Sequence, residues 1–570
     1  MFTPAIADQR FVLDHVARIA DLAATERFAA ASDDVVDAVL EGVGQLAAGE
    51  WAPLLRAGDT VGAKWTPEGV VMPDGFVKAY HDYVEGGWGT IGVPEEFGGQ
   101  GLPFVIQTAV LDTLGTANMG FALAPTLTVG AIEALAHHGS PEQQALYLPH
   151  LATGAWTGTM NLTEPQAGSD VGALRTTATP RGDGTFLIKG TKIYISFGDH
   201  DMAPNIVHLV LARTPGAPAG TKGISLFLVP KYRLNADGTP GDFNDVRVVS
   251  IEHKMGLHAS PTCVLSFGDN DDCIGELIGA EFGGIRAMFT MMNNARLNVG
   301  LQGVQVAEAA TQAAVGYALD RVQSPRAGSG SAESVKIVEH PDVRRMLLRM
   351  KAQTMAARAL VYYAASQVDR ATLKEIGGQE RLDILTPLAK AHGTDIGNEV
   401  ASLGIQIHGG MGYIEETGAA QFFRDARITP IYEGTNGIQA ADLVGRKLGM
   451  DNGGVFARLI ADMRAEAQDA GLVDLIDACD EIGRGMAGMD ADDKLAASYP
   501  FLTMLSVATC GWLMERSGRL ATGDDAFAQM KRAACAFYVA QIVPESLGLR
   551  AAATANATVL YSVPAEAFAA

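Results

Sequence analysis

The spacing of apolar residues changes twice along the chain, and this change constrains the possible folds more than any other feature. Up to about residue 155, apolar residues recur at helical spacing. From Trp156 to about Leu277, short β-rich runs follow one another, separated by Gly and Pro turns. Helical spacing returns at Phe282. The order helix, strand, helix predicts an α+β protein with a compact β-barrel or sandwich between helical segments.

Individual elements can be predicted from runs of one periodicity and from the residues that end them. Helical patterns run from Gln107 to Leu148, with breaks expected at Pro125 and at Gly139–Pro141. The predicted strands are Phe186–Gly190, Ile193–Ile195, Ile206–Leu211, Ile224–Val229 and Cys263–Phe267. The predicted later helices are Ala287–Arg321, Pro341–Asp369 and Asp383–Leu403, with a mobile surface loop at Ser324–Ser334.

A chain of 570 residues is too long for a single core and should divide into several domains. We expect an N-terminal helical domain over residues 1–155, a central β-barrel domain over 156–280, a helical bundle over 281–449 and an additional C-terminal helical domain over 450–570. The last has an apolar helical face around Phe501–Trp512, and only Asp451–Gly454 interrupts the chain before it. We therefore expect it to dock on its own subunit or on a dimer partner.

Charge and cysteine content disfavour several classes of function. The chain carries 43 Lys and Arg against 65 Asp and Glu, a formal charge of −22, which disfavours nucleic acid and anionic membranes as partners. Its five cysteines are scattered and form no CxxC pair, so we expect neither a disulfide framework nor a metal site. The N-terminus lacks the apolar core of a signal peptide, and no apolar run reaches membrane-spanning length. We expect a cytoplasmic protein.

One carboxylate lies in an unusual turn, within Ile431–Gln439. Glu433 follows two bulky residues that can exclude water and precedes the sequence Gly-Thr-Asn-Gly. The glycines allow positive φ or a close backbone approach, and Thr435 or Asn436 can cap a helix that begins near Ile438. A carboxylate held on such a turn is a plausible general base. From this stretch alone, the alternative of an ordinary solvated or ion-paired glutamate stays open.

Three separated motifs resemble the acyl-CoA dehydrogenase family. They are Leu162–Asp170 (LTEPQAGSD), Gln406–Tyr413 (QIHGGMGY) upstream of Arg424–Ile428, and Ile431–Gln439 (IYEGTNGIQ). Their order and setting match that family over roughly residues 80–450. Further stretches resemble the long subgroup typified by 3-methylmercaptopropionyl-CoA dehydrogenases, which also carries an extra C-terminal helical domain: Phe11–Leu13, Trp88–Gly101, Ser260–Cys263 and Met291–Gly300.

The resemblance implies a flavoenzyme that uses FAD to desaturate an acyl-CoA thioester between its α and β carbons. The implied substrate is 3-(methylthio)propanoyl-CoA or a short straight-chain acyl-CoA. In the family a base removes the α-proton while hydride passes from the β carbon to flavin N5, and Glu433 matches that base. Some members take the base from the position before the arginine that corresponds to Arg296. That position is Ala295 here, which cannot accept a proton.

The resemblance also assigns ligand contacts, position by position. The implied FAD contacts are Met160, Leu162, Thr163, Gly168, Ser169, Tyr194, Ser196, Arg321, Gln406, Gly409, Gly410, Thr435 and Gly437. The implied substrate contacts are Ser169, Asn293, Arg296, Glu433 and Gly434. Four of these residues differ from the family's frequent choice: Tyr194 stands for Trp, Ser196 for Thr, Asn293 for Asp, and Gly437 for a polar residue.

The resemblance further implies a homodimer, in which Arg321 and the Gln406–Gly410 turn hold FAD partly from the neighbouring subunit. It implies an electron-transferring flavoprotein as electron acceptor. Two alternatives remain: an acyl-CoA oxidase-like enzyme that uses O₂, and the DNA-associated branch of the same fold. The second would need a basic surface, whereas residues 451–570 carry more Asp and Glu than Lys and Arg.

Overall fold

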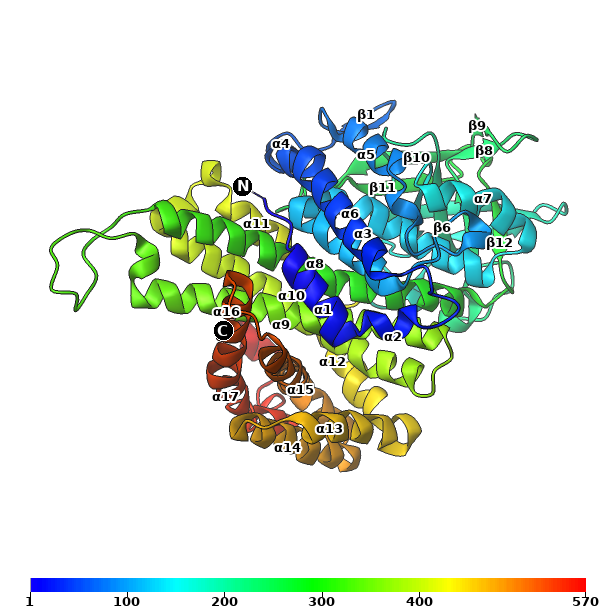
Figure 1. The fold of residues 1–570 in the computed structure, drawn as a ribbon. Helices are drawn as coiled ribbons and strands as arrows, with labels where there is room; N and C mark the ends of the chain where they lie inside the picture. The colour runs from blue at the N-terminus through cyan, green and yellow to red at the C-terminus, as the bar shows by residue number, and fades with distance from the viewer. Residues whose placement is uncertain (1) are drawn as a thin grey trace. The chain divides into compact units, whose positions relative to one another are not determined.

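The structure is a computed structural model that describes residues 2–570 (Figure 1), apart from the side chains of Phe289, Thr290, Met291 and Asn293. The chain forms two compact units. One comprises Met1–Asp37 with Arg296–Ala570, and the other comprises Ala38–Ala295. These units follow boundaries different from those of the four predicted domains, and the four-domain division stays a prediction.

The unit Ala38–Ala295 begins with helices and one short hairpin. Its first elements are most of α3 (Asp33–Leu46), α4 (Leu55–Thr60), β1 (Lys64–Thr66), β2 (Gly69–Val71), α5 (Phe76–Glu85), α6 (Phe104–His138) and α7 (Pro141–Thr153). The helical character predicted for this region is confirmed, whereas helical spacing does not predict the β1–β2 hairpin.

The expected helix break at Pro125 is wrong. Helix α6 continues through Pro125, and its kink lies at Asn118, whose φ of −161° and ψ of 87° are not helical. Asn118 caps the second half of the helix, because its Oδ1 accepts a hydrogen bond of 3.3 Å from the Phe121 N–H. The break expected at Gly139–Pro141 is confirmed, since α6 ends there and Ser140 caps α7.

Helix α6 also corrects the expectation about apolar runs. By length and composition it could cross a membrane, contrary to the expectation that no run would be long enough. Length and apolar composition alone are weak support for a membrane span, because core helices share both. Most of the apolar window of α6 is buried inside the protein, as expected of a core helix.

A mixed sheet of eight strands fills the rest of this unit. Its strands are β3 (Thr157–Asn161), β4 (Thr177–Pro180), β5 (Thr185–Ser196), β6 (Ile206–Ala212), β7 (Ser225–Pro230), β10 (Val246–Ile251), β11 (Thr262–Phe267) and β12 (Ile274–Ile278). The order is β10-β11-β5-β12-β7-β6-β3, with β4 also paired to β5. Strands β3 and β6 are parallel, and the other pairs of this sheet are antiparallel. A separate hairpin joins β8 (Tyr232–Leu234) to β9 (Pro240–Phe243).

The predicted strands Phe186–Gly190 and Ile193–Ile195 form the single strand β5. Its first residues pair with β12 and its later residues pair with β11. At the change of partner, Gly190 approaches Thr176 so closely that a Cβ would lie 2.4 Å from the threonine hydroxyl. The other predicted strands correspond to β6, β7 and β11, so the predicted fold class is confirmed.

The second unit is helical. Before the C-terminal segment it contains α1 (Ile6–Val12), α2 (Ile19–Ala23), most of α8 (Gly284–Asp320), α9 (Pro341–Thr372), α10 (Gly378–His408), α11 (Ala419–Ala426) and α12 (Asn436–Gly445). The three long helices predicted here are confirmed as α8, α9 and α10. The segment Ser324–Ser334 is exposed and lies outside helices and strands, as predicted for a surface loop.

Helices α8 and α10 pack backbone against backbone. Gly303 of α8 lies so close to α10 that a Cβ would meet the Gly393 carbonyl oxygen at 1.9 Å. Gly300 makes a similar approach, with a Cβ position 2.5 Å from the Ala389 carbonyl oxygen. The glycines therefore set the spacing of the two helices.

The C-terminal segment adds five helices to this unit: α13 (Gly454–Glu466), α14 (Ala470–Gly485), α15 (Ala491–Leu520), α16 (Ala526–Phe537) and α17 (Val543–Leu547). Helix α15 packs on α9, α10 and α12, and its apolar face around Phe501 and Leu505 is fully buried. The expectation that the segment docks on its own subunit is confirmed.

Candidate functional site

The turn that carries Glu433 joins α11 to α12 and is held by hydrogen bonds at its ends. The Asn436 N–H donates to the Pro430 carbonyl at 2.9 Å, and the Thr435 hydroxyl caps α12 by accepting a backbone N–H at 3.2 Å. Glu433 and Gly434 adopt left-handed φ angles of 55° and 84°. A glutamate rarely takes this conformation, so the backbone is strained at the predicted base.

The surroundings of Glu433 raise the pKa of its carboxyl group. Burial favours the neutral form, and the positive charges of Arg296 and Lys390 oppose this effect without reversing it. A carboxylate with a raised pKa binds a proton more tightly, which suits a general base near neutral pH. An ordinary solvated glutamate would have neither the burial nor the two cations.

The two bulky residues before Glu433 differ in their contacts. Tyr432 is half-buried and its hydroxyl donates to the side-chain oxygen of Gln302 in α8. Ile431 is exposed, with 48% of its surface accessible. Tyr432 is therefore fixed against α8, and the expectation that both residues keep water from Glu433 stays a prediction.

Arg296 is buried close to the predicted base. Its Nε has no hydrogen-bond partner among the residues that the structure describes. Burial lowers the pKa of its guanidinium group, and the charges of Asp442 and Glu433 oppose this shift. Because an unsatisfied buried donor costs free energy, this atom fits a polar group of a bound ligand.

A buried polar cluster beside the turn is missing from the sequence-based site. Lys390 of α10 is fully buried and donates 2.9 Å to Oδ1 of Asn436. The Asn436 amide donates 2.9 Å to Asp395, whose other carboxylate oxygen accepts from the Tyr499 hydroxyl at 2.7 Å. A lysine inside the apolar run of the predicted helix Asp383–Leu403 is the sequence signal that could have revealed it.

In the unit Ala38–Ala295, the LTEPQAGSD motif forms a turn after β3 that is held by a buried ion pair. Glu164 accepts hydrogen bonds from Lys192 Nζ at 2.8 Å and from the Thr176 hydroxyl at 2.6 Å. Burial alone would raise the pKa of Glu164, but Lys192 and these hydrogen bonds lower it to about 2. Lys192 also donates to the Leu162 carbonyl at 3.2 Å, which fixes the turn against β5.

The predicted flavin contacts in this unit differ in exposure. Leu162, Thr163 and Ser196 are half-buried, and Gly168 and Ser169 are exposed at the tip of the turn. Met160 is buried in the hydrophobic core. Tyr194 is 60% exposed and has a left-handed φ of 61°, so its ring is accessible as an aromatic cover would need to be.

The remaining predicted cofactor contacts lie at the C-terminal ends of α8 and α10, apart from Thr435, which caps α12, and Gly437, which lies in the first turn of α12. Tyr317 of α8 stacks on His408 of α10 with ring centroids 4.4 Å apart, which brings these two ends together. Arg321 follows α8, and the exposed residues at the end of α10 are Gln406, Gly409 and Gly410. The side chain of Asn293, a predicted substrate contact, lies outside the described part of the chain.

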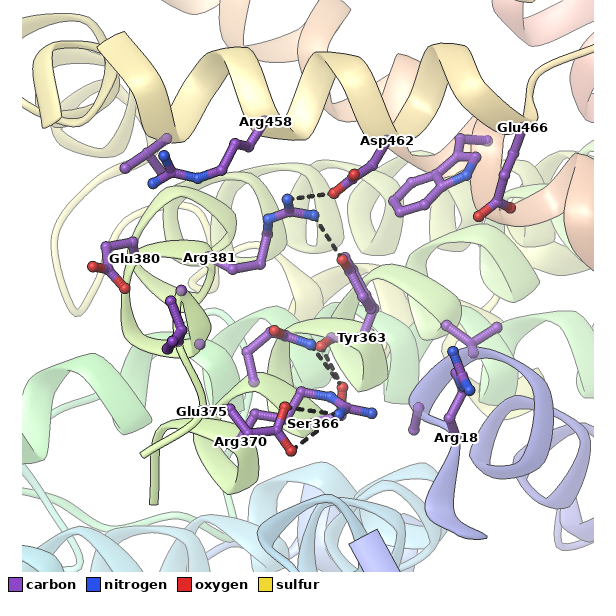
Figure 2. Close-up of a pocket in the computed structure, with 18 of the residues that line it drawn as sticks. Arg18, Tyr363, Ser366, Arg370, Glu375, Glu380, Arg381, Arg458, Asp462 and Glu466 are labelled. Atoms are coloured by element: carbon purple, nitrogen blue, oxygen red, sulfur yellow. Dashed lines mark hydrogen bonds and ion pairs between the residues drawn. The ribbon is translucent and has the colours of Figure 1, made fainter. Parts of the chain in front are cut away.

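A cavity of about 810 Å³ lies elsewhere in the helical unit, lined by residues of α9, α10, α13 and α15 (Figure 2). Its arginines are paired: Arg381 donates to Asp462 at 2.5 Å and to the Tyr363 hydroxyl at 2.9 Å, and Arg370 bonds Glu375 at 3.0 Å. The residues described around it include none of the predicted site residues. Because its cations are neutralised, we assign no anionic ligand to it.

Models of the acyl-CoA dehydrogenase family match most of the chain. The N-terminal domain matches residues 37–155, the middle domain 159–270 and the C-terminal domain 283–449. A further model, described as acetyl-CoA dehydrogenase C-terminal like, matches residues 454–564.

Individual relatives agree with these matches. The chain is 44% identical to the 3-methylmercaptopropionyl-CoA dehydrogenase of Ruegeria pomeroyi, over 95% of this chain and 96% of that protein. It is 37% identical to a butyryl-CoA dehydrogenase of Syntrophomonas wolfei, over 94% of each. A solved acyl-CoA dehydrogenase complexed with FAD from Bacillus anthracis shares the fold at 22% identity, with a TM-score of 0.73 over 92% of this chain and 88% of that one. The protein belongs to the acyl-CoA dehydrogenase family.

Proposed function

We propose that this flavoprotein oxidoreductase uses FAD to desaturate a short acyl-CoA between its α and β carbons, with Glu433 as the base that removes the α-proton. The observation that carries the proposal is the position of Glu433 on a strained turn, where burial raises its pKa and Arg296 and Lys390 lie nearby. Ala295 offers no carboxylate at the position that some relatives use, so the chemistry rests on Glu433.

The protein's own groups prepare this step. Glu433 must be ionised to accept the α-proton, and the charges of Arg296 and Lys390 favour the ionised form while burial keeps its proton affinity high. The unsatisfied Nε of Arg296 offers a donor to a ligand oxygen. FAD, when bound, supplies the acceptor for the β-hydrogen as hydride.

Two features of the described residues fit FAD. The turn after β3 leaves Gly168 and Ser169 exposed, and the ion pair between Glu164 and Lys192 anchors the turn. Arg321, at the end of α8, is exposed and offers paired guanidinium donors of the kind that suit a pyrophosphate. Its exposure supports our proposal that it serves a neighbouring subunit in a homodimer.

The substrate is proposed from the relatives. Because the chain covers nearly the whole length of a 3-methylmercaptopropionyl-CoA dehydrogenase at 44% identity, we propose 3-(methylthio)propanoyl-CoA as the first candidate. The similarity to butyryl-CoA dehydrogenases supports a short straight-chain acyl-CoA as the second. We further propose that an electron-transferring flavoprotein accepts the electrons and that the protein works in the cytoplasm.

Anaerobic titration of the purified, FAD-loaded protein tests this function. We expect 3-(methylthio)propanoyl-CoA or butyryl-CoA to bleach the flavin absorbance and to yield the matching enoyl-CoA. Failure of all short acyl-CoA thioesters to bleach the flavin would overturn the proposal. Rapid reoxidation in air without an added acceptor would favour the oxidase alternative.

A further inference from the structure

A tyrosine of the C-terminal helices contacts the polar cluster beside the turn that carries Glu433. The Tyr499 hydroxyl, on α15, donates to Asp395 Oδ2 of α10 at 2.7 Å. The same hydroxyl accepts a weaker bond of 3.4 Å from the amide of Asn436, the first residue of α12. Helix α15 belongs to the segment that matches the separate C-terminal family model, so the contact joins that segment to the turn with the predicted base.

The orientation of the Asn436 amide follows from its partners. Lys390 Nζ can only donate, so the atom it bonds at 2.9 Å must be the Asn436 carbonyl oxygen. The amide nitrogen then faces acceptors, with Asp395 Oδ1 at 2.9 Å and the Thr394 hydroxyl at 3.0 Å. Since Asn436 is 3% exposed and Lys390 is fully buried, breaking the bonds between them would leave polar groups unsatisfied, whereas Tyr499 at the other end of the network is 37% exposed.

We propose that Tyr499 is a positioning residue for the reaction: it holds Asp395 and Asn436, and these hold Lys390 and the turn in the arrangement that Glu433 needs. The C-terminal segment thereby takes part in the active site through α15. This inference rests on the proposed role of Glu433 as the base.

The charges around the cluster determine the direction in which the pKa of Glu433 should change. Burial lowers the pKa of Lys390 to about 8, and the carboxylates of Glu433 and Asp395 raise it, while Arg296 lowers it. Burial raises the pKa of Asp395. Its bonds to Tyr499 and Asn436 and the charges of Lys390 and Arg427 lower that pKa.

Glu433 faces Arg296 and Lys390, and its neighbour Tyr432 stays neutral because burial raises the pKa of Tyr432. Arg296 in turn faces Asp442 and Arg446.

Loss of negative charge at Asp395 should therefore reach Glu433 through Lys390. Without that charge Lys390 is held less firmly beside Glu433, so less positive charge stabilises ionised Glu433 and the pKa of Glu433 rises. Loss of the Tyr499 hydroxyl raises the pKa of Asp395 and should act in the same direction, to a smaller extent. The acidic limb of the pH profile should move to higher pH in both cases.

The test compares Tyr499→Phe and Asp395→Asn in the full-length, FAD-loaded protein with Thr503→Ala as the control. Thr503 lies one turn further along α15, where its hydroxyl bonds the Tyr499 carbonyl of its own helix. The rate of flavin bleaching by a short acyl-CoA is measured from pH 5.5 to 9. We expect Tyr499→Phe to slow bleaching at pH 6 by roughly three- to tenfold, as for loss of one ordinary hydrogen bond, and Asp395→Asn to slow it more.

The outcomes separate this inference from the proposed function. If the wild-type protein bleaches with acyl-CoA but Tyr499→Phe keeps the wild-type pH profile, the positioning role is wrong while the function stands. A wild-type protein that fails with every short thioester would instead refute the function. A uniform loss of rate at all pH values, with unchanged flavin content, would also overturn the inference, because Tyr499 would then have no effect on the pKa of Glu433. If Asp395→Asn fails to fold, Tyr499→Phe alone decides.

Discussion

Asp8 of α1 accepts a hydrogen bond of 2.7 Å from Lys531 of α16, a residue 523 positions later in the chain. Arg358 of α9 donates to the other oxygen of the same carboxylate at 2.7 Å. All three side chains are buried, so the start and the end of the chain meet on α9 through ion pairs that water does not screen.

This cluster predicts a pH-dependent stability. Burial alone would raise the pKa of Asp8, but Lys531 and Arg358 lower it from 3.8 to about 2. The folded pKa lies below the ordinary one, so the carboxylate stabilises the fold above about pH 4, and this contribution of roughly 2 kcal/mol is lost as the pH falls through 2. Urea unfolding should show Asp8→Asn less stable at pH 7 by about 3 kcal/mol, because it leaves two buried cations without their carboxylate. The exposed Asp34→Asn serves as the control. Equal stability of the two variants would contradict the prediction.

The Asp8 cluster also shows what the sequence could not predict. Periodicity located α8, α9 and α10 because each buries an apolar face over several turns. It could not pair Asp8 with Lys531, since nothing local connects them. The same limit hid Tyr499 and Asp395, whose contact joins α15 to α10.

In the sheet, strand β3 was missed because its sequence, TGTMN, is largely polar although every residue is buried. Its threonines are satisfied by histidines that are distant in sequence: Thr157 bonds His200 at 2.8 Å, and Thr159 bonds His208 at 2.7 Å.

The kink of α6 was also hidden from the sequence. It lies at Asn118 because the Asn118 side chain caps the part of the helix that follows, and Pro125 lies within that part without breaking it. The motif around Glu433, in contrast, was readable because its glycine and its cap are consecutive in the sequence.

The base assignment predicts the effect of Glu433→Gln. Glutamine keeps the shape and hydrogen bonding of the side chain but cannot take the α-proton, so we expect bleaching by acyl-CoA to slow by at least about 10²–10⁴-fold. Flavin content and acyl-CoA binding should be retained. The exposed Glu26→Gln should behave as wild type. Substantial turnover by Glu433→Gln, measured by stopped-flow absorbance, would mean that another group is the base.

The proposed shared cofactor site predicts the effect of Arg321→Ala. If Arg321 binds the FAD of a neighbouring subunit, the variant should lose flavin during gel filtration, and excess FAD should restore it. Arg326→Ala removes the same charge from the exposed loop Ser324–Ser334 and should change nothing. The measurement is the ratio of flavin to protein absorbance after the column. If both variants keep full flavin, Arg321 is an ordinary surface charge, with an effect on stability within about 0.5 kcal/mol.

The contact between α8 and α10 predicts opposite effects for two glycines of one helix. Gly303→Ala would place a Cβ 1.9 Å from the Gly393 carbonyl oxygen, so the helices must separate. We expect a loss of about 1–3 kcal/mol or more in thermal or urea unfolding, as for an overpacked core. Gly316→Ala meets nothing within 4 Å and should stabilise α8 by about 0.5–1 kcal/mol. Similar stability of the two variants would show that the close approach is relaxed in solution.

Removal of the C-terminal segment tests its structural role. Truncation after Gly449 would expose the faces of α9, α10 and α12 that α15 covers, and would leave Arg349, which Glu545 bonds at 2.8 Å, without that partner. Exposed apolar helix faces associate with other surfaces, so we expect the truncated protein to aggregate or to form an assembly larger than that of the full-length protein. Light scattering after size exclusion measures the assembly. If the truncated protein folds, the loss of Tyr499 should shift the pH profile of flavin bleaching at least as far as Tyr499→Phe does. A truncated protein with unchanged assembly, stability and pH profile would show that the segment is independent of the rest of its unit.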